Sequence, residues 1–159
     1  MRIVVLLLTL YLACARGAWA VENFRVLFNG YDLSGWEGDP KVWRVSDGLL
    51  VGETKTSNEI KTNTFLIWKG FDVDDFELRT VVRLEGPNSG VQYRSHRDPQ
   101  GGDYCIAGYQ ADLHTTPNYS GMLYEERGRG ILAERGNRVK IGRSGETYRD
   151  SLPVSNRLI

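Results

Sequence analysis

The sequence predicts a single domain built almost entirely of β-strands, arranged as a sandwich or a barrel. From Val21 onward, short apolar segments alternate with turn residues, and glycine is frequent, at 18 residues in the chain. No window of eleven or more residues keeps its apolar side chains at helical spacing. Since 159 residues make one domain of ordinary size, a separate cofactor-binding domain is excluded.

Each expected strand is a short apolar segment that lies between turn signals. Seven segments fit this description: Val42–Val45, Leu49–Glu53, Thr64–Trp68, Phe76–Leu84, Gly90–Arg94, Ile106–Leu113 and Gly121–Tyr124. Two later apolar fragments, near Ile131–Ala133 and Val139–Ile141, follow them. Strands at this spacing are typical of two packed sheets or of a closed barrel.

The first twenty residues are typical of a secretory signal peptide. A positive charge at Arg2 is followed by an apolar run, Ile3–Ala13, and by the small-residue cleavage pattern Ala18-Trp19-Ala20. The run has about eleven residues, whereas a helix needs about 20 to span a bilayer. We expect cleavage after Ala20, a mature domain of residues 21–159 without a membrane span, and a secreted or periplasmic location. Lipidation of Cys14 is the alternative.

Charge and cysteine content argue against several classes of function. Lys plus Arg and Asp plus Glu each number 20, and this even balance speaks against nucleic acid, which requires a strongly basic surface. After loss of the leader, Cys105 is the only cysteine, so no internal disulfide is expected. Cys105, His96 and His114 lack the spacing of a structural zinc site. No nucleophile-elbow motif of a serine hydrolase is present.

Apolar and polar side chains alternate along three consecutive segments, 76–84, 90–94 and 106–113. Tyr93 and Tyr109 fall on the apolar side of their segments. We therefore expect these two rings to face the core and the intervening polar side chains to face outward.

Antiparallel pairing of these segments defines a row of polar side chains. Matching apolar to apolar positions, and centring the second hairpin on its glycine pair, aligns Arg83, Gln92 and Asp112, with Arg94 opposite Gln110. Such a row is either a solvated sheet face with cross-strand ion pairs or a surface that binds a polyol. Sugars require multidentate hydrogen-bonding groups and apolar faces for their rings.

Seven blocks of sequence occur in one order and carry a specific resemblance. They are 28–36 (FNGYDLSGW), 48–53, 65–69, 75–78, 88–94 (NSGVQYR), 108–112 (GYQAD) and 124–130 (YEERGRG). Together they resemble the 3-keto-disaccharide hydrolase domain family over about residues 24–135. The resemblance implies a concanavalin-like jelly-roll β-sandwich, exported by bacteria, that acts on glycosides whose sugar is oxidised at C3.

The implied reaction needs three groups around the sugar. A ketone at C3 acidifies the C2 proton, so a base can remove it, the enolate can expel the C1 substituent, and water can add back. The site therefore requires a base near C2, a cation or hydrogen-bond donor for the enolate oxygen, and a proton source for the leaving oxygen. We expect no cofactor for this reaction, with a divalent cation left open.

The candidate site residues combine the resemblance with the polar row. The expected catalytic residues are an arginine that stabilises the enolate and an acid that acts as base or orients hydroxyls, drawn from Arg94, Asp112, Glu125 and Arg127. The expected substrate-binding residues are Arg83, Gln92, Gln110 and Glu53. An ordinary surface or inter-strand ion pair is the alternative for each charged residue.

Three further alternatives stay open at this point. A noncatalytic carbohydrate-binding module has the same sandwich fold, because one fold hosts both functions. A divalent cation, calcium above all, could bind at Asp72, Asp74 and Asp75, although three acids before a strand are more often a solvated turn. The resemblance weakens over Arg135–Ile159, so we expect the sandwich to be incomplete at its C-terminal end.

Overall fold

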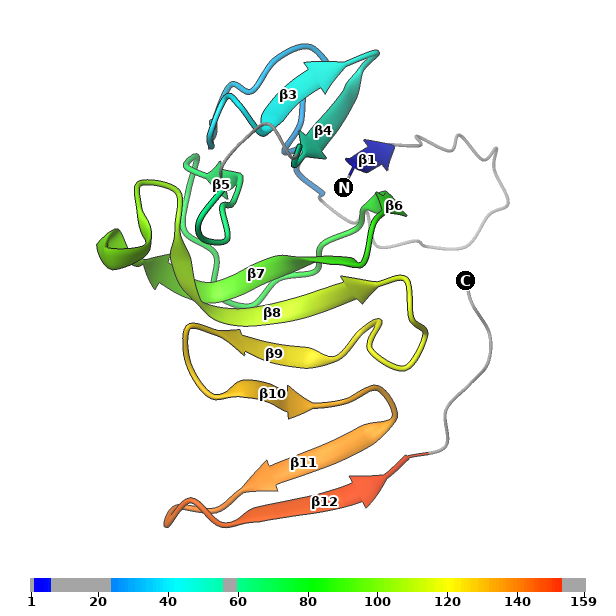
Figure 1. The fold of residues 1–159 in the computed structure, drawn as a ribbon, viewed down its shortest axis with the longest axis vertical. Coiled ribbons are helices and arrows are strands. Elements are labelled where there is room, and N and C mark those ends of the chain that lie inside the picture. The colour runs from blue at the N-terminus through cyan, green and yellow to red at the C-terminus, as the bar shows by residue number, and fades with distance from the viewer. Residues whose placement is uncertain (1, 7–23, 56–59, 153–159) are drawn as a thin grey trace, which may run out of the picture.

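The computed structural model describes residues 2–6, 24–55 and 60–152 and has an all-β fold, as predicted (Figure 1). Within these residues the helical structure is one 3₁₀ turn, Pro99–Gly101. The strands are β1 (Arg2–Leu6), β2 (Trp36–Glu37), β3 (Trp43–Ser46), β4 (Leu49–Glu53), β5 (Ile67–Trp68), β6 (Val81–Glu85), β7 (Asn88–Arg97), β8 (Ile106–His114), β9 (Leu123–Glu126), β10 (Gly130–Ala133), β11 (Asn137–Ile141) and β12 (Thr147–Ser151).

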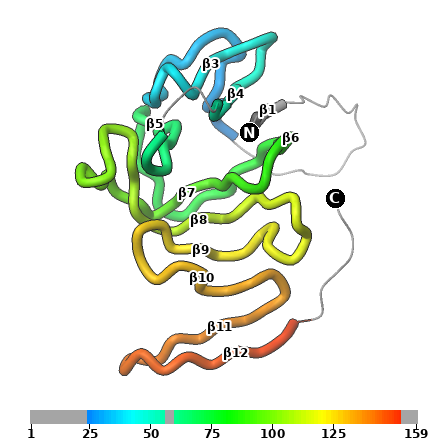
Figure 2. Tube along the Cα trace, viewed as in Figure 1, coloured from blue at the N-terminus to red at the C-terminus, as the bar shows by residue number. Residues whose placement is uncertain are grey.

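The strands pair antiparallel in two four-stranded sheets and two smaller pairs. One sheet has the order β3-β4-β1-β6 and the other the order β10-β9-β8-β7. The pairs are β11 with β12 and β2 with β5. Strands β7 to β12 follow one another as a ladder, with β3 and β4 at the far end of the molecule (Figures 1 and 2). The ladder strands β7, β8 and β9 carry most of the candidate site residues.

Strand β1 lies between β4 and β6, although it comes from the start of the expected signal peptide. Its residue Val5 pairs with Leu50 of β4 on one side and with Val82 of β6 on the other. Cleavage after Ala20 would therefore remove the strand that joins β4 to β6. Ala20 itself, and Cys14 of the lipidation alternative, lie outside the described residues.

A compact cluster of half-buried aromatic rings joins the two strands of the β2–β5 pair. Trp36 and Trp68 meet edge to face with ring centroids 5.1 Å apart, and the Trp36 indole N–H donates to the Leu27 carbonyl at 2.8 Å. Gly35 and Gly70 lie against the Trp68 ring, where a Cβ atom would come within 2.8 and 2.2 Å of ring carbons. Glycine is required at both positions because the ring occupies the space of a side chain.

The expected strand over Phe76–Leu84 is mostly wrong. Only Val81–Glu85 forms a strand, because β1 pairs with residues 81–85 and offers no partner to the residues before them. Phe76 and Leu78 are 48% and 43% exposed, so their alternation does not mark a core face. The segment expected at Thr64–Trp68 is likewise reduced to Ile67–Trp68.

Strand β12 was not predicted, because its sequence has no apolar alternation. All five of its residues are exposed, and it pairs with β11 through registers such as Val139 with Arg149. A two-stranded hairpin of this kind forms from local turn geometry rather than from burial of an apolar face.

The predicted pairing of β7 with β8 is wrong by two residues. Gln92 lies opposite Gln110, and Asp112 lies opposite Gly90. The short 3₁₀ turn in the loop, and an irregularity in β7 between Tyr93 and His96, shift the pairing relative to a simple hairpin. Gln92 and Asp112, which the prediction places opposite each other, are therefore diagonal neighbours.

The predicted direction of the two faces is also wrong. Asp112 and Gln110 are 1% and 7% exposed, whereas Ala111 between them is exposed. Tyr93 and Tyr109 therefore lie on the outer face of the sheet and the amide and carboxyl groups on its inner face. Arg83 does not extend the row, because β6 belongs to the other sheet.

Gly90 makes the inner arrangement possible, and its replacement tests the register. A Cβ atom at Gly90 would lie 2.4 Å from the Gln110 Cγ atom. Gly90→Ala should lower the free energy of unfolding by about 1–3 kcal/mol in urea denaturation, as overpacking does. In a Gln110→Ala background the clash is gone, so Gly90→Ala should cost little. An equal loss in both backgrounds would contradict the register.

Candidate functional site

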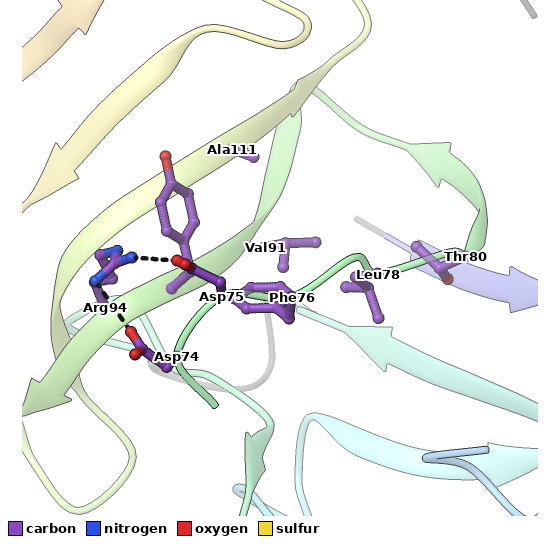
Figure 3. A pocket seen from close by; sticks show the side chains of 9 residues that line it. Asp74, Asp75, Phe76, Leu78, Thr80, Val91, Arg94 and Ala111 are labelled. Atoms are coloured by element: carbon purple, nitrogen blue, oxygen red, sulfur yellow. Dashed lines mark hydrogen bonds and ion pairs between the residues drawn. The ribbon is translucent and has the colours of Figure 1, made fainter. Parts of the chain in front are cut away.

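A pocket of about 470 Å³ lies on the outer face of β7 and β8 (Figure 3). Its floor is formed by strand side chains and its wall by the irregular segment that precedes β6. The lining residues are Asp74, Asp75, Phe76, Leu78, Thr80, Val91, Tyr93, Arg94 and Ala111. The pocket thus combines apolar surface, for a sugar ring, with an arginine and two carboxylates at one end.

Arg94 enters the pocket from a distorted point in β7. Its backbone has φ of 46°, in the left-handed region, where the β7 pairing is interrupted after Tyr93. Its Nη2 donates to the Asp75 Oδ1 at 3.1 Å, and its Nη1 lies 3.8 Å from the Asp74 Oδ1 (Figure 3). The Asp75 side chain is 96% exposed, so this pair is solvated when the pocket is empty.

Two tyrosines continue the outer face next to the pocket. Tyr93 and Tyr109 are directly opposite in the β7–β8 pairing, with ring centroids 6.0 Å apart and planes tilted by 50°. Tyr109 lies in turn opposite Glu125 of β9. Cross-strand neighbours of this kind form a continuous row over three strands.

The row ends in a tightly bonded ion pair. Glu125 accepts hydrogen bonds from the Arg129 backbone N–H at 3.0 Å, from its Nε, and from its Nη2 at 3.3 Å. These bonds hold the pKa of Glu125 below its ordinary value. The Arg129 Nη2 also lies 3.5 Å from the Tyr109 hydroxyl. Gly128 is required here, because a Cβ atom would come within 2.6 Å of the Glu125 Cγ.

The inner face holds a chain of three polar side chains. The Gln92 Nε2 donates to the Gln110 Oε1 at 3.0 Å, and the Gln110 Nε2 donates to the Asp112 Oδ1 at 2.5 Å. Burial raises the pKa of Asp112. Asp112 is therefore separated by the sheet from Arg94, its expected partner in catalysis.

The other expected site residues form separate ion pairs. Arg127 pairs with Asp98 and Arg83 with Glu85. Glu53 accepts from Arg44 at 2.8 Å and lies 3.6 Å from Lys55, and these contacts lower its pKa, the Arg44 bond most. The structure thus brings Gln92, Gln110 and Asp112 together, places Arg94 and Glu125 on the outer face, and leaves Arg83, Glu53 and Arg127 outside the pocket lining.

Sequence reasoning missed four residues of the outer face. The sequence predicts Tyr93 and Tyr109 in the core and Asp75 in a solvated turn or a calcium site, and Arg129 is not among its expected site residues. The available signal was the spacing of four residues between Glu125 and Arg129 across a glycine, which allows the chain to turn back and close an ion pair. The tyrosines could be found only once the buried face was known.

The described part of the chain has neither a cluster of metal-ligating side chains nor a membrane-spanning helix. No group of three or more His, Cys, Asp or Glu side chains among those residues is placed to hold a metal ion, so Asp72, Asp74 and Asp75 do not form a calcium site there. None of the helical structure in those ranges is long and apolar enough to cross a membrane.

A family model described as the 3-keto-alpha-glucoside-1,2-lyase-like domain matches residues 23–150. The chain belongs to this family. The match includes the blocks at 28–36, 88–94, 108–112 and 124–130, so the resemblance to 3-keto-disaccharide hydrolase domains is confirmed. No curated protein and no solved structure matches the chain. The family indicates a carbohydrate-related domain.

Proposed function

We propose that the protein cleaves glycosides whose sugar carries a ketone at C3, by elimination of the C1 substituent followed by addition of water. The family supports a glycoside as the substrate. The observation that carries the proposal is the contact of Arg94 with Asp75, at 3.1 Å, at the end of an apolar pocket.

The reaction acts on two adjacent carbon atoms, which constrains the protein groups. A base removes the proton from C2 while a cation or donor stabilises negative charge on the oxygen at C3. The two groups must therefore lie within a few ångströms of each other. Arg94 and Asp75 satisfy this requirement, with the guanidinium at the C3 oxygen and the carboxylate at the C2 proton.

The outer face has two arginine–carboxylate pairs, and the hydrogen bonds to each carboxylate indicate which one acts as the base. Asp75 accepts from Arg94 at 3.1 Å and is otherwise exposed, so its oxygens can reach a proton. Glu125 is held by three hydrogen bonds from Arg129, which lower its pKa and leave its oxygens less free to reach a substrate proton. A sugar that covers Asp75 excludes water and strengthens the electrostatic interaction with Arg94.

The row of Tyr93, Tyr109 and Glu125 supplies a proton to the leaving group and contacts it. Tyr93 lines the same pocket, and its phenol is a proton source for the leaving oxygen. Neighbouring strands lie about 4.8 Å apart, so Tyr109, one strand from Tyr93, extends the row beyond the pocket by about the width of one sugar ring. Tyr109 and Arg129 are placed to contact that second ring, which favours a disaccharide as substrate.

Of the residues expected to be catalytic from the sequence, Arg94 keeps that role in this proposal. Glu125 becomes a substrate-binding residue at the far end of the row. Asp112 and Arg127 do not line the pocket and have no direct part in the proposed reaction.

The paired tyrosines also favour a second candidate function. Two neighbouring aromatic rings on an open sheet face are a feature of carbohydrate-binding modules, which bind sugars by stacking and need no base. Such a module should lose affinity when a tyrosine is truncated and keep it when a carboxylate is neutralised. The enzyme should instead lose turnover when the Asp75 carboxylate is neutralised.

The catalytic pair is tested with matched aspartate variants. Asp75→Asn and Arg94→Gln should each lower the turnover of a 3-keto-glycoside by on the order of 10²-fold or more, as loss of a base or an oxyanion partner does. Asp74→Asn is the control, because Asp74 lies 3.8 Å from Arg94 and makes the longer contact. Turnover near the wild-type value in folded Asp75→Asn protein would rule out Asp75 as the base.

We also propose that the protein is exported after cleavage of residues 1–20. Mass spectrometry of the exported protein should find Val21 at the N-terminus, because the residues at the cleavage site are small. Ala20→Arg should block cleavage, since the residue before the cut must be small. A lipidated Cys14, or an intact Met1 in the exported form, would contradict the proposal.

A further inference from the structure

The inner face of β7 and β8 contains polar atoms that the hydrogen bonds described above leave without partners. Within the described part of the chain, the Gln92 Oε1 and the Asp112 Oδ2 are buried and accept no hydrogen bond. Asp112 is 1% exposed. A buried acceptor without a donor destabilises the folded state, and an unpaired buried carboxylate does so more strongly.

A single proton shared between the Gln92 Oε1 and the Asp112 Oδ2 would give both atoms a hydrogen-bond partner. Both side chains belong to the same chain of hydrogen bonds, which runs from Gln92 through Gln110 to Asp112. Gln92 lies opposite Gln110, and Asp112 lies opposite Gly90, so Gln92 and Asp112 are diagonal neighbours on one face. Gly90 has no side chain to separate them.

We propose that the Asp112 carboxyl group stays protonated in the folded protein and donates from Oδ2 to the Gln92 Oε1, closing a ring of three hydrogen bonds. One proton then provides a partner for both buried oxygens and removes the buried charge. This inference is independent of the proposed function, because it concerns the inner face alone.

The surroundings of Asp112 agree with a neutral carboxyl group. His114 lies two residues along β8, and its Nδ1 accepts from the Thr116 backbone N–H at 2.8 Å, so its neutral form carries the proton on Nε2. Burial raises the pKa of Asp112, and this outweighs the opposing effects of the Gln110 hydrogen bond and of His114.

Three other titratable side chains, Tyr124, Glu126 and His96, lie on the two strands that flank β8. In the β8–β9 pairing Tyr124 lies opposite Gln110, and Glu126 lies opposite Gly108 and accepts from the Asn63 amide at 3.1 Å. On β7, His96 lies opposite Ala107, beyond the irregularity. Glu126 therefore lies four residues along β8 from the position of Asp112 and has its own partner in Asn63.

Protonation of Asp112 in the folded chain makes the free energy of unfolding depend on pH. The folded chain keeps a proton that the unfolded chain releases above the ordinary Asp value of 3.8. The contribution of the ring is therefore complete below that pH, and it declines as pH rises toward the raised pKa of the folded state. Above that pKa the buried carboxylate is charged, and its Oδ2 accepts no hydrogen bond from the described residues.

The direct test is a ¹³C NMR titration of the Asp112 carboxyl carbon in the full chain. Asp112 should keep the chemical shift of a protonated carboxyl group at pH values above the ordinary Asp value of 3.8. An Asp112 that ionises at or below that ordinary value would overturn the proposal. This measurement uses the wild-type protein and does not depend on any variant.

Variants provide the second test. Asp112→Asn should remove the decline of melting temperature above pH 3.8, because the amide closes the ring without titrating. Gln92→Met should lower the pKa of Asp112, since the neutral form loses its acceptor. Asp75→Asn, on the outer face, is the control and should leave the decline unchanged. A melting temperature that rises with added Ca²⁺ or Na⁺ only when Asp112 is present would overturn the proposal in favour of a bound cation.

Discussion

The antiparallel pairing of β7 with β8 is the constraint on which the rest of the structure depends. Side chains alternate between the two faces of a strand, so one register decides every position at once. With Gln92 opposite Gln110, the Gln110 amide and the Asp112 carboxyl group are buried, and Tyr93 and Tyr109 lie half-buried on the opposite face. A shift by one residue would exchange the faces and remove both the inner hydrogen-bond chain and the outer pocket.

The outer face derives its chemistry from the difference between two arginine–carboxylate pairs. Both are cross-linked by hydrogen bonds, but Asp75 has one bond from Arg94 whereas Glu125 has three from Arg129. A loosely held carboxylate can exchange its partner for a substrate proton, and a tightly held one provides fixed geometry. The same pairing of residue types therefore supports catalysis at one end of the row and binding at the other.

The sequence was sufficient for the fold class, for β4 at Leu49–Glu53 and for β8 to within one residue. It was not sufficient for the faces of the sheet, because alternation defines two faces without saying which one is covered. Contacts distant in sequence decide that, such as the bonds from Asn63 to Glu126. Arg94 and Glu125 could be selected from sequence blocks, whereas Asp75 became a candidate only through its contact with Arg94.

Removal of the C2 proton is the central step of the proposed reaction. The sugar released in D₂O shows whether this step occurs. Elimination followed by addition of water returns a solvent proton to C2. NMR of the released sugar should therefore show deuterium at C2, beyond the exchange seen without protein. A released sugar that keeps its original hydrogen at C2 would mean direct displacement at C1, and it would contradict the role proposed for Arg94 and Asp75.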